Sequence, residues 1–280
     1  MSSSPLVTVY ITTKNRRRLL DRAVNSVLNQ SYGNIELIII DDGSSDDTEE
    51  VYSEYISPEI ENYIYLRNPQ SKGACFSRNL GIGAANGQYI TGLDDDDYFS
   101  PERVSLLYKS FLRRSDCLFV CDSSDVRRDK VRKEKLIVYE DMFYKNVVGN
   151  QIFTTTELLR SAGGFDERMP AWQDYELWIR LLKQGGHGLK IRESLQTVDT
   201  EHGSIRISRN TEKVLRAQDI FFEKHLSKLG VNEQNRRRLL TSMRYGAPIE
   251  NLKPSGMVNL GNLAIYFICV IRRLKNGILG

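Results

Sequence analysis

The stretch at residues 89–97 reads Tyr89-Ile90-Thr91-Gly92-Leu93-Asp94-Asp95-Asp96-Asp97. Its first five residues are typical of a buried strand, and four consecutive aspartates follow them. Adjacent carboxylates repel one another, so such a run needs a specific reason to exist. Open α/β sheets bind ligands at the carboxyl ends of their strands, and carboxylate oxygens suit Mg²⁺ or Mn²⁺. The stretch therefore predicts a divalent metal site, with a solvated acidic turn as the alternative.

Strands and helices alternate on both sides of this stretch. Apolar, β-branched runs predict further strands, and amphipathic or capped segments predict helices between them. The expected strands are 6–12, 35–40, 63–66 and 89–93, and the expected helices are 16–29, 46–56, 73–85 and 101–113. This alternation predicts an α/β fold with a mostly parallel central sheet and helices on both faces.

The pattern loosens after Cys117. Residues 118–121 and 136–139 are expected to form strands, and 174–183 forms an amphipathic helix. Residues 210–229 and 234–245 are predicted to be helical. A boundary near residue 205 is expected to separate the α/β part, over 1–205, from a helical C-terminal region over 206–280.

The composition is that of an ordinary soluble globular protein. The 280 residues are 40% hydrophobic and 27% charged, and a net charge of +3 gives no argument for nucleic acid as a partner. The four cysteines form no CxxC pair, and Cys117 and Cys121 are expected to be buried free thiols. With no secretory signal at the N-terminus, these features predict a cytoplasmic protein.

Two more polar groups are candidates for the site. Asp41 and Asp42 follow a predicted strand, where a carboxylate can bind a base or ribose, although Asp and Gly also simply make turns. Lys72 and Arg78 lie at a helix start, a natural neighbour of phosphate, or are scattered surface charges. Gly81 and Gly83 resemble a dinucleotide fingerprint, but they fall inside a helix with the wrong spacing.

Two candidates lie further along the chain. Asp174 begins the helix 174–183 between Trp172 and Trp178, where an acid can act as a general base or merely cap the helix. His202 stands in a turn-like setting, as a metal or phosphate ligand or as an ordinary packed or surface histidine.

Taken together, these motifs resemble the family 2 glycosyltransferases, which have the GT-A fold. The likeness covers about residues 5–205, and within the family it is to bacterial surface polysaccharide enzymes of the colanic-acid and O-antigen type. The matching segments are Val7–Asn15, Val27–Tyr32, Ile40–Asp46, Gly73–Ala74, Ser77–Ile82, Gly87–Asp97 with Pro101, Gly149–Gln151 and Gln173–Leu177.

The resemblance implies that 1–205 is a catalytic domain, with a nucleotide-sugar part to about residue 100 and an acceptor part from 101. It also implies a role for each candidate. Asp174 matches the catalytic base, and Asp96, with His202, matches the metal site. The donor nucleotide would contact Thr12, Asn15, Asp42, Lys72, Arg78, Asp94 and Asp95. The family's DxD motif is replaced here by four consecutive aspartates. The aspartate that binds the metal could therefore be Asp96 or a residue one position away from it. The base follows Gln173 where Glu is commoner.

The implied reaction is inverting transfer of a sugar, using Mn²⁺ or Mg²⁺, from a UDP-sugar to a saccharide acceptor linked to polyprenyl diphosphate. Two other functions are considered. A sugar-phosphate nucleotidylyltransferase would need a glycine-rich loop after the first strand, where this chain has Thr12-Thr13-Lys14-Asn15. An inactive binding relative would be expected to have lost Asp96 and Asp174.

Residues 257–271 have apolar side chains at helical spacing, and Arg272, Arg273 and Lys275 follow them. At about 1.5 Å per residue the stretch is shorter than the roughly 30 Å hydrocarbon core. We therefore expect an in-plane amphipathic helix on an anionic membrane, at the inner face of the cytoplasmic membrane. The alternative is packing on the catalytic domain or on a second subunit of a homo-oligomer.

Overall fold

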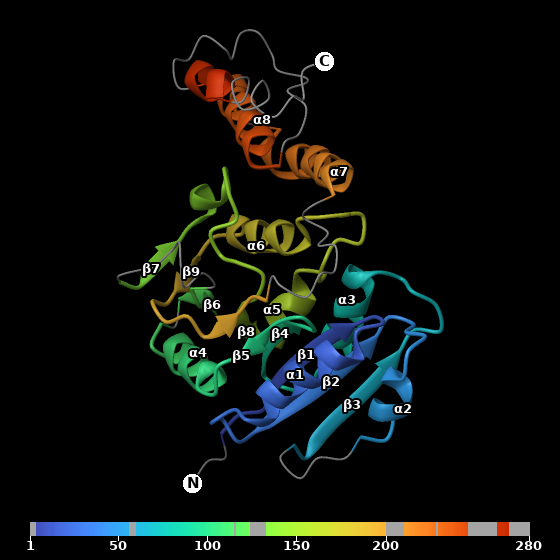
Figure 1. The fold of residues 1–280 in the computed structure, drawn as a ribbon. Coiled ribbons are helices and arrows are strands. Elements are labelled where there is room, and N and C mark those ends of the chain that lie inside the picture. Colours follow the sequence, from blue (N-terminus) through green and yellow to red (C-terminus); the bar gives the residue numbers. More distant parts are fainter. Residues whose placement is uncertain are drawn as a thin grey trace. The chain divides into compact units, whose positions relative to one another are not determined.

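The fold is built around one large sheet (Figure 1), as seen in a computed structural model that describes residues 4–55, 60–114, 116–123, 133–199, 210–227, 229–245 and 262–268. Within these residues the sheet has eight strands, in the order β3-β2-β1-β4-β8-β6-β9-β7. They are β1 Val7–Thr13, β2 Ile35–Asp41, β3 Asn62–Arg67, β4 Tyr89–Asp94, β6 Cys117–Cys121, β7 Lys135–Ile137, β8 Phe153–Thr155 and β9 His187–Lys190. Two short strands, β5 Tyr98–Phe99 and β10 Gln196–Thr197, pair separately.

The predicted mostly parallel arrangement is confirmed. Strands β3, β2, β1 and β4 all run parallel, and so do β6 and β9. Strand β8 runs antiparallel to β4 and β6, and β7 runs antiparallel to β9. The strand expected over 136–139 is β7 instead, because a 3-10 turn already begins at Tyr139.

Helices connect and cover the strands. They are α1 Arg17–Leu28, α2 Thr48–Tyr52, α3 Ala74–Ala84, α4 Arg103–Leu112, α5 Thr156–Ser161, α6 Gln173–Lys183, α7 Thr211–Phe221 and α8 Val231–Tyr245, with 3-10 turn η1 Tyr139–Met142 and π-helical turn η3 Phe222–Leu226. Helix α2 is shorter than the predicted 46–56. Its start is fixed by Asp46, whose Oδ1 accepts hydrogen bonds from the backbone N–H and the hydroxyl of Thr48.

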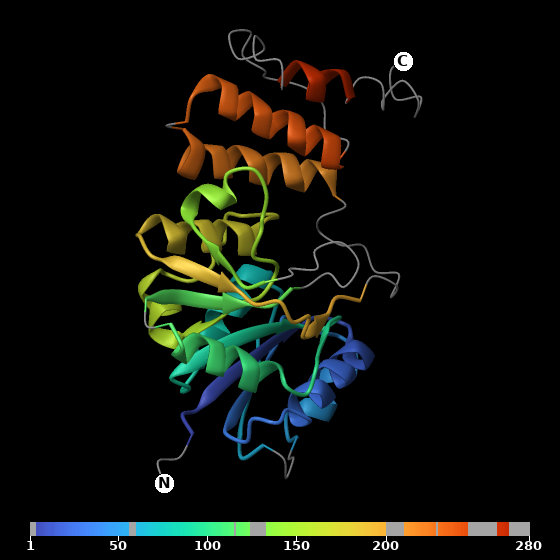
Figure 2. The same cartoon turned by 90° about the vertical axis from the view of Figure 1, so that its left-hand side faces the viewer.

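Side chains alternate between the two faces of the sheet, and both faces are covered. Val9 and Ile11 of β1 pack in a core cluster with Leu20 and Val24 of α1. On the opposite face, a Cβ at Gly81 would lie 2.8 Å from Ile40 Cδ1, so only glycine lets α3 approach β2 this closely. Figures 1 and 2 show α1 in blue beside strands β1 and β2.

The chain divides into two compact units. The first contains Met1–Tyr139, Asn146–Glu167 and Gln173–Gly203, and the second contains Glu140–Lys145, Arg168–Trp172 and Ser204–Gly280. Within the second unit, the Arg237 guanidinium stacks 4.8 Å from the Trp172 ring and donates a hydrogen bond to the Tyr144 carbonyl. None of the helices described is long and apolar enough to cross a membrane.

A buried ion pair lies at the centre of the first unit. Arg103 is fully buried at the start of α4, and its Nη2 lies 3.3 Å from Asp122 Oδ1, just after β6. Its Nη1 also donates to Thr91 Oγ1, and its guanidinium stacks on the Phe99 ring. Burial lowers the pKa of the Arg103 guanidinium, and the Asp122 carboxylate acts to raise it. The buried cation therefore depends on Asp122 to offset its loss of hydration.

We therefore expect Asp122→Ala to lower the free energy of unfolding by about 3 kcal/mol or more, because it leaves a buried cation unpaired. The matched control is Glu134→Ala, which breaks the exposed pair with Arg113 and should cost at most about 1 kcal/mol. Urea unfolding of both variants measures the difference. Equal losses for the two variants would contradict this view of the core.

Candidate active site

The polar residues of the site gather at one edge of the sheet because strands β2, β1 and β4 are parallel neighbours. In the register of β1, Thr12 lies opposite Asp94 of β4, and Thr13 lies opposite Asp41 of β2. Both acidic motifs recognised in the sequence therefore end at the same edge. This is the edge at which open α/β sheets bind their ligands.

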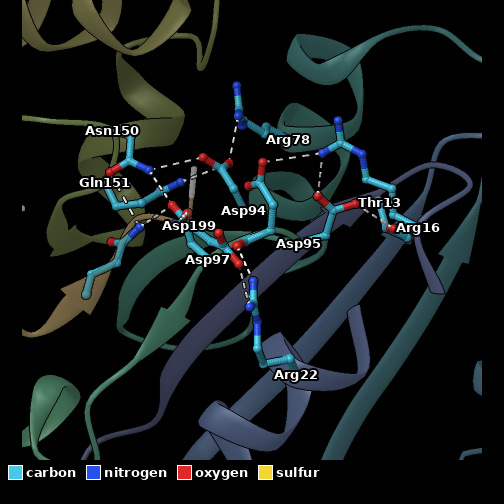
Figure 3. Close-up of polar contacts among 12 residues, drawn as sticks. Thr13, Arg16, Arg22, Arg78, Asp94, Asp95, Asp97, Asn150, Gln151 and Asp199 are labelled. Atoms are coloured by element: carbon cyan, nitrogen blue, oxygen red, sulfur yellow. Dashed lines mark hydrogen bonds and ion pairs between the residues drawn. The ribbon is translucent and has the colours of Figure 1, made fainter. Parts of the chain in front are cut away.

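Asp94, Asp95 and Asp97 do not share one direction, as Figure 3 shows. Asp95 turns toward the end of β1, where it accepts hydrogen bonds from Thr13 Oγ1 at 2.8 Å and Arg16 Nη1 at 3.0 Å. Burial raises the pKa of Asp95 to about 6, while Arg16 and Thr13 act in the opposite direction. With both oxygens engaged inside the protein, Asp95 is placed to hold the loop after β1.

Asp94 turns to the opposite side of the run. Its Oδ1 lies 2.9 Å from Arg78 Nη2 and accepts from the Gln151 amide at 3.3 Å, while its Oδ2 accepts from the Asn150 amide at 3.1 Å. Asp97 accepts from Asn150, from Gln196 and from the backbone N–H of Asp199. Burial, together with the charges of Asp94 and Asp96, raises the pKa of Asp97 to about 7.

Three of the four aspartates form a candidate metal cluster. One carboxylate oxygen each of Asp94, Asp96 and Asp97 can be chosen so that all three lie within 4.8 Å of one another. Three hard oxygen donors at this spacing fit Mg²⁺ or Mn²⁺. Asp96, the predicted ligand, belongs to the cluster, and His202 lies outside the described residues.

Two arginines near the N-terminus complete the surroundings of the acid run. Arg16 Nη1 lies 3.5 Å from Asp96 as well as bonding to Asp95. Arg22, on α1, donates to the backbone carbonyl of Asp96 at 2.6 Å and pairs with Asp199 at 2.6 Å. These residues were missed as site residues, although their position six residues apart, soon after the first strand, was a signal.

The second acidic motif organises the loop before α3. Asp42 accepts five hydrogen bonds from the described residues, and its side chain is largely buried. Burial alone would raise the pKa of Asp42, but the hydrogen bonds that its carboxylate accepts hold this pKa below its ordinary value. The donors are Asn68 Nδ2, Ser71 Oγ, Ser77 Oγ and the backbone N–H groups of Lys72 and Gly73.

The remaining predicted donor contacts lie around this loop. Asn15 has a positive φ of 53°, and its Oδ1 accepts from the Ser45 backbone N–H at 2.7 Å, which ties the end of β1 to the end of β2. Thr12 is half-buried on β1. Lys72 is exposed, with its Nζ 4.3 Å from the centre of the Phe76 ring. These positions border the sheet edge, and their roles stay predictions.

Asp174 begins helix α6 and is linked to the acid run through Arg78. Arg78 Nη1 donates to Gln173 Oε1 at 2.9 Å while its Nη2 pairs with Asp94. Asp174 itself accepts from Asn146 Nδ2 at 3.0 Å. Burial raises the pKa of Asp174 to about 6, and the nearby Arg78 lowers it. Such a carboxylate is ionised at neutral pH and still basic enough to accept a proton.

Glu176, two residues further along α6, has a different environment. It is fully buried and forms an ion pair with Arg180, whose Nη2 lies 3.0 Å from Oε2. Arg180 also donates to the Gly164 carbonyl. Glu176 therefore holds the loop after α5, and Asp174 is the acid of this helix that lies with the site.

Comparison with known proteins gives this geometry a context. The profile of the family described as Glycosyl transferase family 2 matches residues 8–162. The WcaA protein of Escherichia coli K12, named for colanic acid biosynthesis, is 34% identical over 240 residues, 81% of this chain and 84% of the relative. TuaG of Bacillus subtilis 168, named for teichuronic acid biosynthesis, is 30% identical over 72% of this chain and 81% of its own.

Solved structures support the fold at 14% identity. The mannosyltransferase PcManGT of Pyrobaculum calidifontis, solved with GDP-Man and Mn²⁺, gives a TM-score of 0.64 over 98% of this chain and 81% of its own. TarS 1–349 of S. aureus, solved with UDP, gives 0.61 over 85% and 70%. The predicted GT-A fold is confirmed, and with the family match and the likeness to WcaA, this chain belongs to glycosyltransferase family 2 and is a glycosyltransferase.

Proposed function

We propose that this enzyme is a metal-dependent, inverting glycosyltransferase that moves a sugar from a UDP-sugar to a saccharide acceptor. The observation that carries the proposal is the link through Arg78, which joins the carboxylate cluster of Asp94, Asp96 and Asp97 to the start of the helix that holds Asp174. A site for a nucleoside diphosphate and a basic carboxylate are thereby held on one scaffold.

The residues divide between two tasks. A divalent cation held by the cluster would supply Lewis-acid stabilisation of the departing diphosphate. Arg78 and Arg16 add fixed positive charge beside the same carboxylates, which supports binding of an anionic donor. Asn15, Asp42 and Lys72, around the neighbouring strand ends, are proposed to form the nucleoside side of the site together with Thr12.

Asp174 is proposed to be the general base. Its carboxylate accepts the proton of the acceptor hydroxyl while that oxygen attacks the anomeric carbon and the bond to the diphosphate breaks. The attack comes from the face opposite the leaving group, so a single displacement inverts the anomeric configuration. The raised pKa of Asp174, about 6, suits this task near neutral pH.

The choice of substrate rests on the relatives. WcaA and TuaG are named for bacterial polysaccharides, which supports a surface polysaccharide such as O-antigen or exopolysaccharide, with a polyprenyl-diphosphate-linked saccharide as acceptor. UDP is proposed as the carrier because TarS structures hold UDP and UDP-GlcNAc, whereas PcManGT holds GDP-Man. Release of UDP from UDP-sugars, with and without EDTA, separates glycosyl transfer from nucleotidylyl transfer and from an inactive binding protein.

For the cation, we expect Asp96→Ala to abolish transfer and to weaken Mn²⁺-dependent UDP binding while the protein stays folded. The matched control is Asp116→Ala, which removes an exposed aspartate before β6, at the opposite edge of the sheet. Calorimetry of UDP with and without Mn²⁺ measures both variants. Unchanged metal-dependent affinity in folded Asp96→Ala would remove Asp96 from the metal site.

For the base, we expect Asp174→Asn to keep donor affinity and to lower turnover by a factor on the order of a hundred or more, since the amide cannot accept the proton. In the unmodified enzyme the base must be ionised, so turnover should fall as pH drops through about 6. Single-turnover assays across pH measure both effects. A turnover near that of the unmodified enzyme would show that another group is the base.

The enzyme is proposed to work at the inner face of the cytoplasmic membrane, with its C-terminal region on anionic lipid. Of the predicted amphipathic helix 257–271, the structure describes residues 262–268 as helical, with Phe267 58% and Ile268 44% exposed. Exposed apolar side chains beside a basic segment are typical of helices that lie in the membrane interface.

We therefore expect the double variant Phe267→Asp/Ile268→Asp to lose sedimentation with anionic liposomes while UDP-sugar hydrolysis is retained. Leu112→Asp, at a leucine of α4 that is 55% exposed, should bind liposomes normally. An unmodified protein that never sediments with liposomes would defeat the membrane proposal. A change of oligomeric state in the double variant would instead assign this surface to a homo-oligomer contact.

A further inference from the structure

One short segment, Asn146–Gln151, contacts both the candidate base and the candidate metal cluster. Asn146 Nδ2 donates to Asp174 Oδ2 at 3.0 Å. Asn150 Nδ2 lies 3.1 Å from Asp94 Oδ2 and 2.9 Å from Asp97 Oδ2, and Gln151 Nε2 donates to Asp94 Oδ1. Figure 3 shows Asn150 and Gln151 on one side of the acid run, opposite Thr13 and Arg16.

The backbone of this segment is fixed from several sides. Val148 is buried, and the Val147 carbonyl accepts from Lys190 Nζ of β9 at 3.1 Å. Gly149 has a φ of 116°, a conformation that favours glycine, and its carbonyl accepts from Trp178 Nε1 of α6 at 3.0 Å. The segment is thus attached both to the sheet and to the helix that carries Asp174.

The Asn146 side chain uses all of its hydrogen-bonding groups in this arrangement. Its Oδ1 accepts from the backbone N–H groups of Val148 and Gly149, at 3.0 and 3.1 Å. Its Nδ2 donates to the Gly149 carbonyl at 2.9 Å and to Asp174. This pattern fixes which end of the amide is nitrogen. One oxygen of Asp174 is therefore held by a neutral side-chain donor, and backbone N–H groups of Tyr175 and of Asp174 itself also donate to this carboxylate.

Asn150 has a corresponding position between two carboxylates. A single amide nitrogen donates to both Asp94 and Asp97, so it reduces their mutual repulsion without neutralising either charge. An arginine or lysine at this position would compete with a divalent cation for the same oxygens. A neutral bridge orients the carboxylates and keeps their charge available for the cation.

We propose that Asn146 and Asn150 are positioning residues of one element, Asn146–Gln151. This element fixes the position of the base, Asp174, relative to the carboxylates of the metal cluster. The inference rests on the proposed function, since it assigns the two asparagines to the base and to the cation site respectively. Neither residue is proposed to touch the reacting atoms. Each acts through the carboxylate to which it donates.

The two roles predict different defects. Asn146→Asp is isosteric and keeps the acceptor for the Val148 and Gly149 N–H groups, but it replaces the donor to Asp174 with a carboxylate. We expect kcat to fall about tenfold or more with donor affinity unchanged. Among the described residues, the charged groups that act most on Asp174 are Arg78, which lowers its pKa, and Asp94, which raises it. An added negative charge and a lost donor both disfavour ionised Asp174, so the acid limb of the kcat profile moves to higher pH.

Asn150→Ala is expected to affect the cation site and to leave the ionisation of Asp174 unchanged. We expect Mn²⁺-dependent UDP binding, measured by calorimetry, to weaken about tenfold or more, with no shift of the acid limb. Asn150→Ser, which can donate to only one carboxylate, should give an intermediate loss and serves if the alanine variant is unstable. The control is Asn25→Ala on the exposed side of α1, which should change neither quantity.

The outcomes separate this inference from the proposed function. If Asp96→Ala and Asp174→Asn behave as expected but folded Asn146→Asp lowers donor affinity without changing kcat, the positioning role of Asn146 is wrong. Unchanged Mn²⁺-dependent binding in both Asn150 variants overturns the role of Asn150. If Asp96→Ala leaves Mn²⁺-dependent UDP binding unchanged and Asp174→Asn leaves turnover unchanged, the proposed function itself is wrong.

Discussion

Repulsion among four consecutive carboxylates is the constraint on which the arrangement of this site depends. Successive side chains of an extended chain leave on opposite sides, so Asp94 and Asp95 enter different surroundings. Asp95 meets Thr13 and Arg16 at the end of β1, whereas Asp94 meets Arg78 and two amides. The run thereby separates into Asp95, held at the end of β1, and three acids that each place one oxygen within 4.8 Å of the others.

The partners that make this separation possible come from distant parts of the chain. The cations are supplied by the loop after β1 and by helices α1 and α3, while the amides come from the segment before β8 and from β10. The parallel order β2-β1-β4 brings the strand ends to one edge, and the reversal at β8 returns the chain with Asn150 and Gln151 beside the acids. The strand pairing that forms the sheet therefore also brings the cations and amides next to the four aspartates.

Short stretches of sequence were sufficient to predict many features of the fold and the site. Strand and helix periodicity, glycines and runs of acids can each be recognised within a few consecutive residues. The strands of the first half, both acidic motifs and the helix that holds Asp174 followed from them, whereas the choice of Asp96 came from the family resemblance. Such stretches could not show that Asp97 is enclosed by Gln196 and Asn150, or that Asn146 donates to Asp174. Those contacts join residues 28 to 99 positions apart, so they depend on how the sheet closes.

Arg78 illustrates why the division of roles cannot be read from one residue at a time. Its Nη2 pairs with Asp94 in the acid cluster, and its Nη1 holds Gln173 beside Asp174. The same cation lowers the pKa of Asp174 against the effect of burial. A charge proposed to bind the donor therefore also affects how readily the proposed base is ionised. Because one guanidinium contacts both the acid cluster and Gln173 beside Asp174, the proposed donor site and the proposed base are coupled electrostatically.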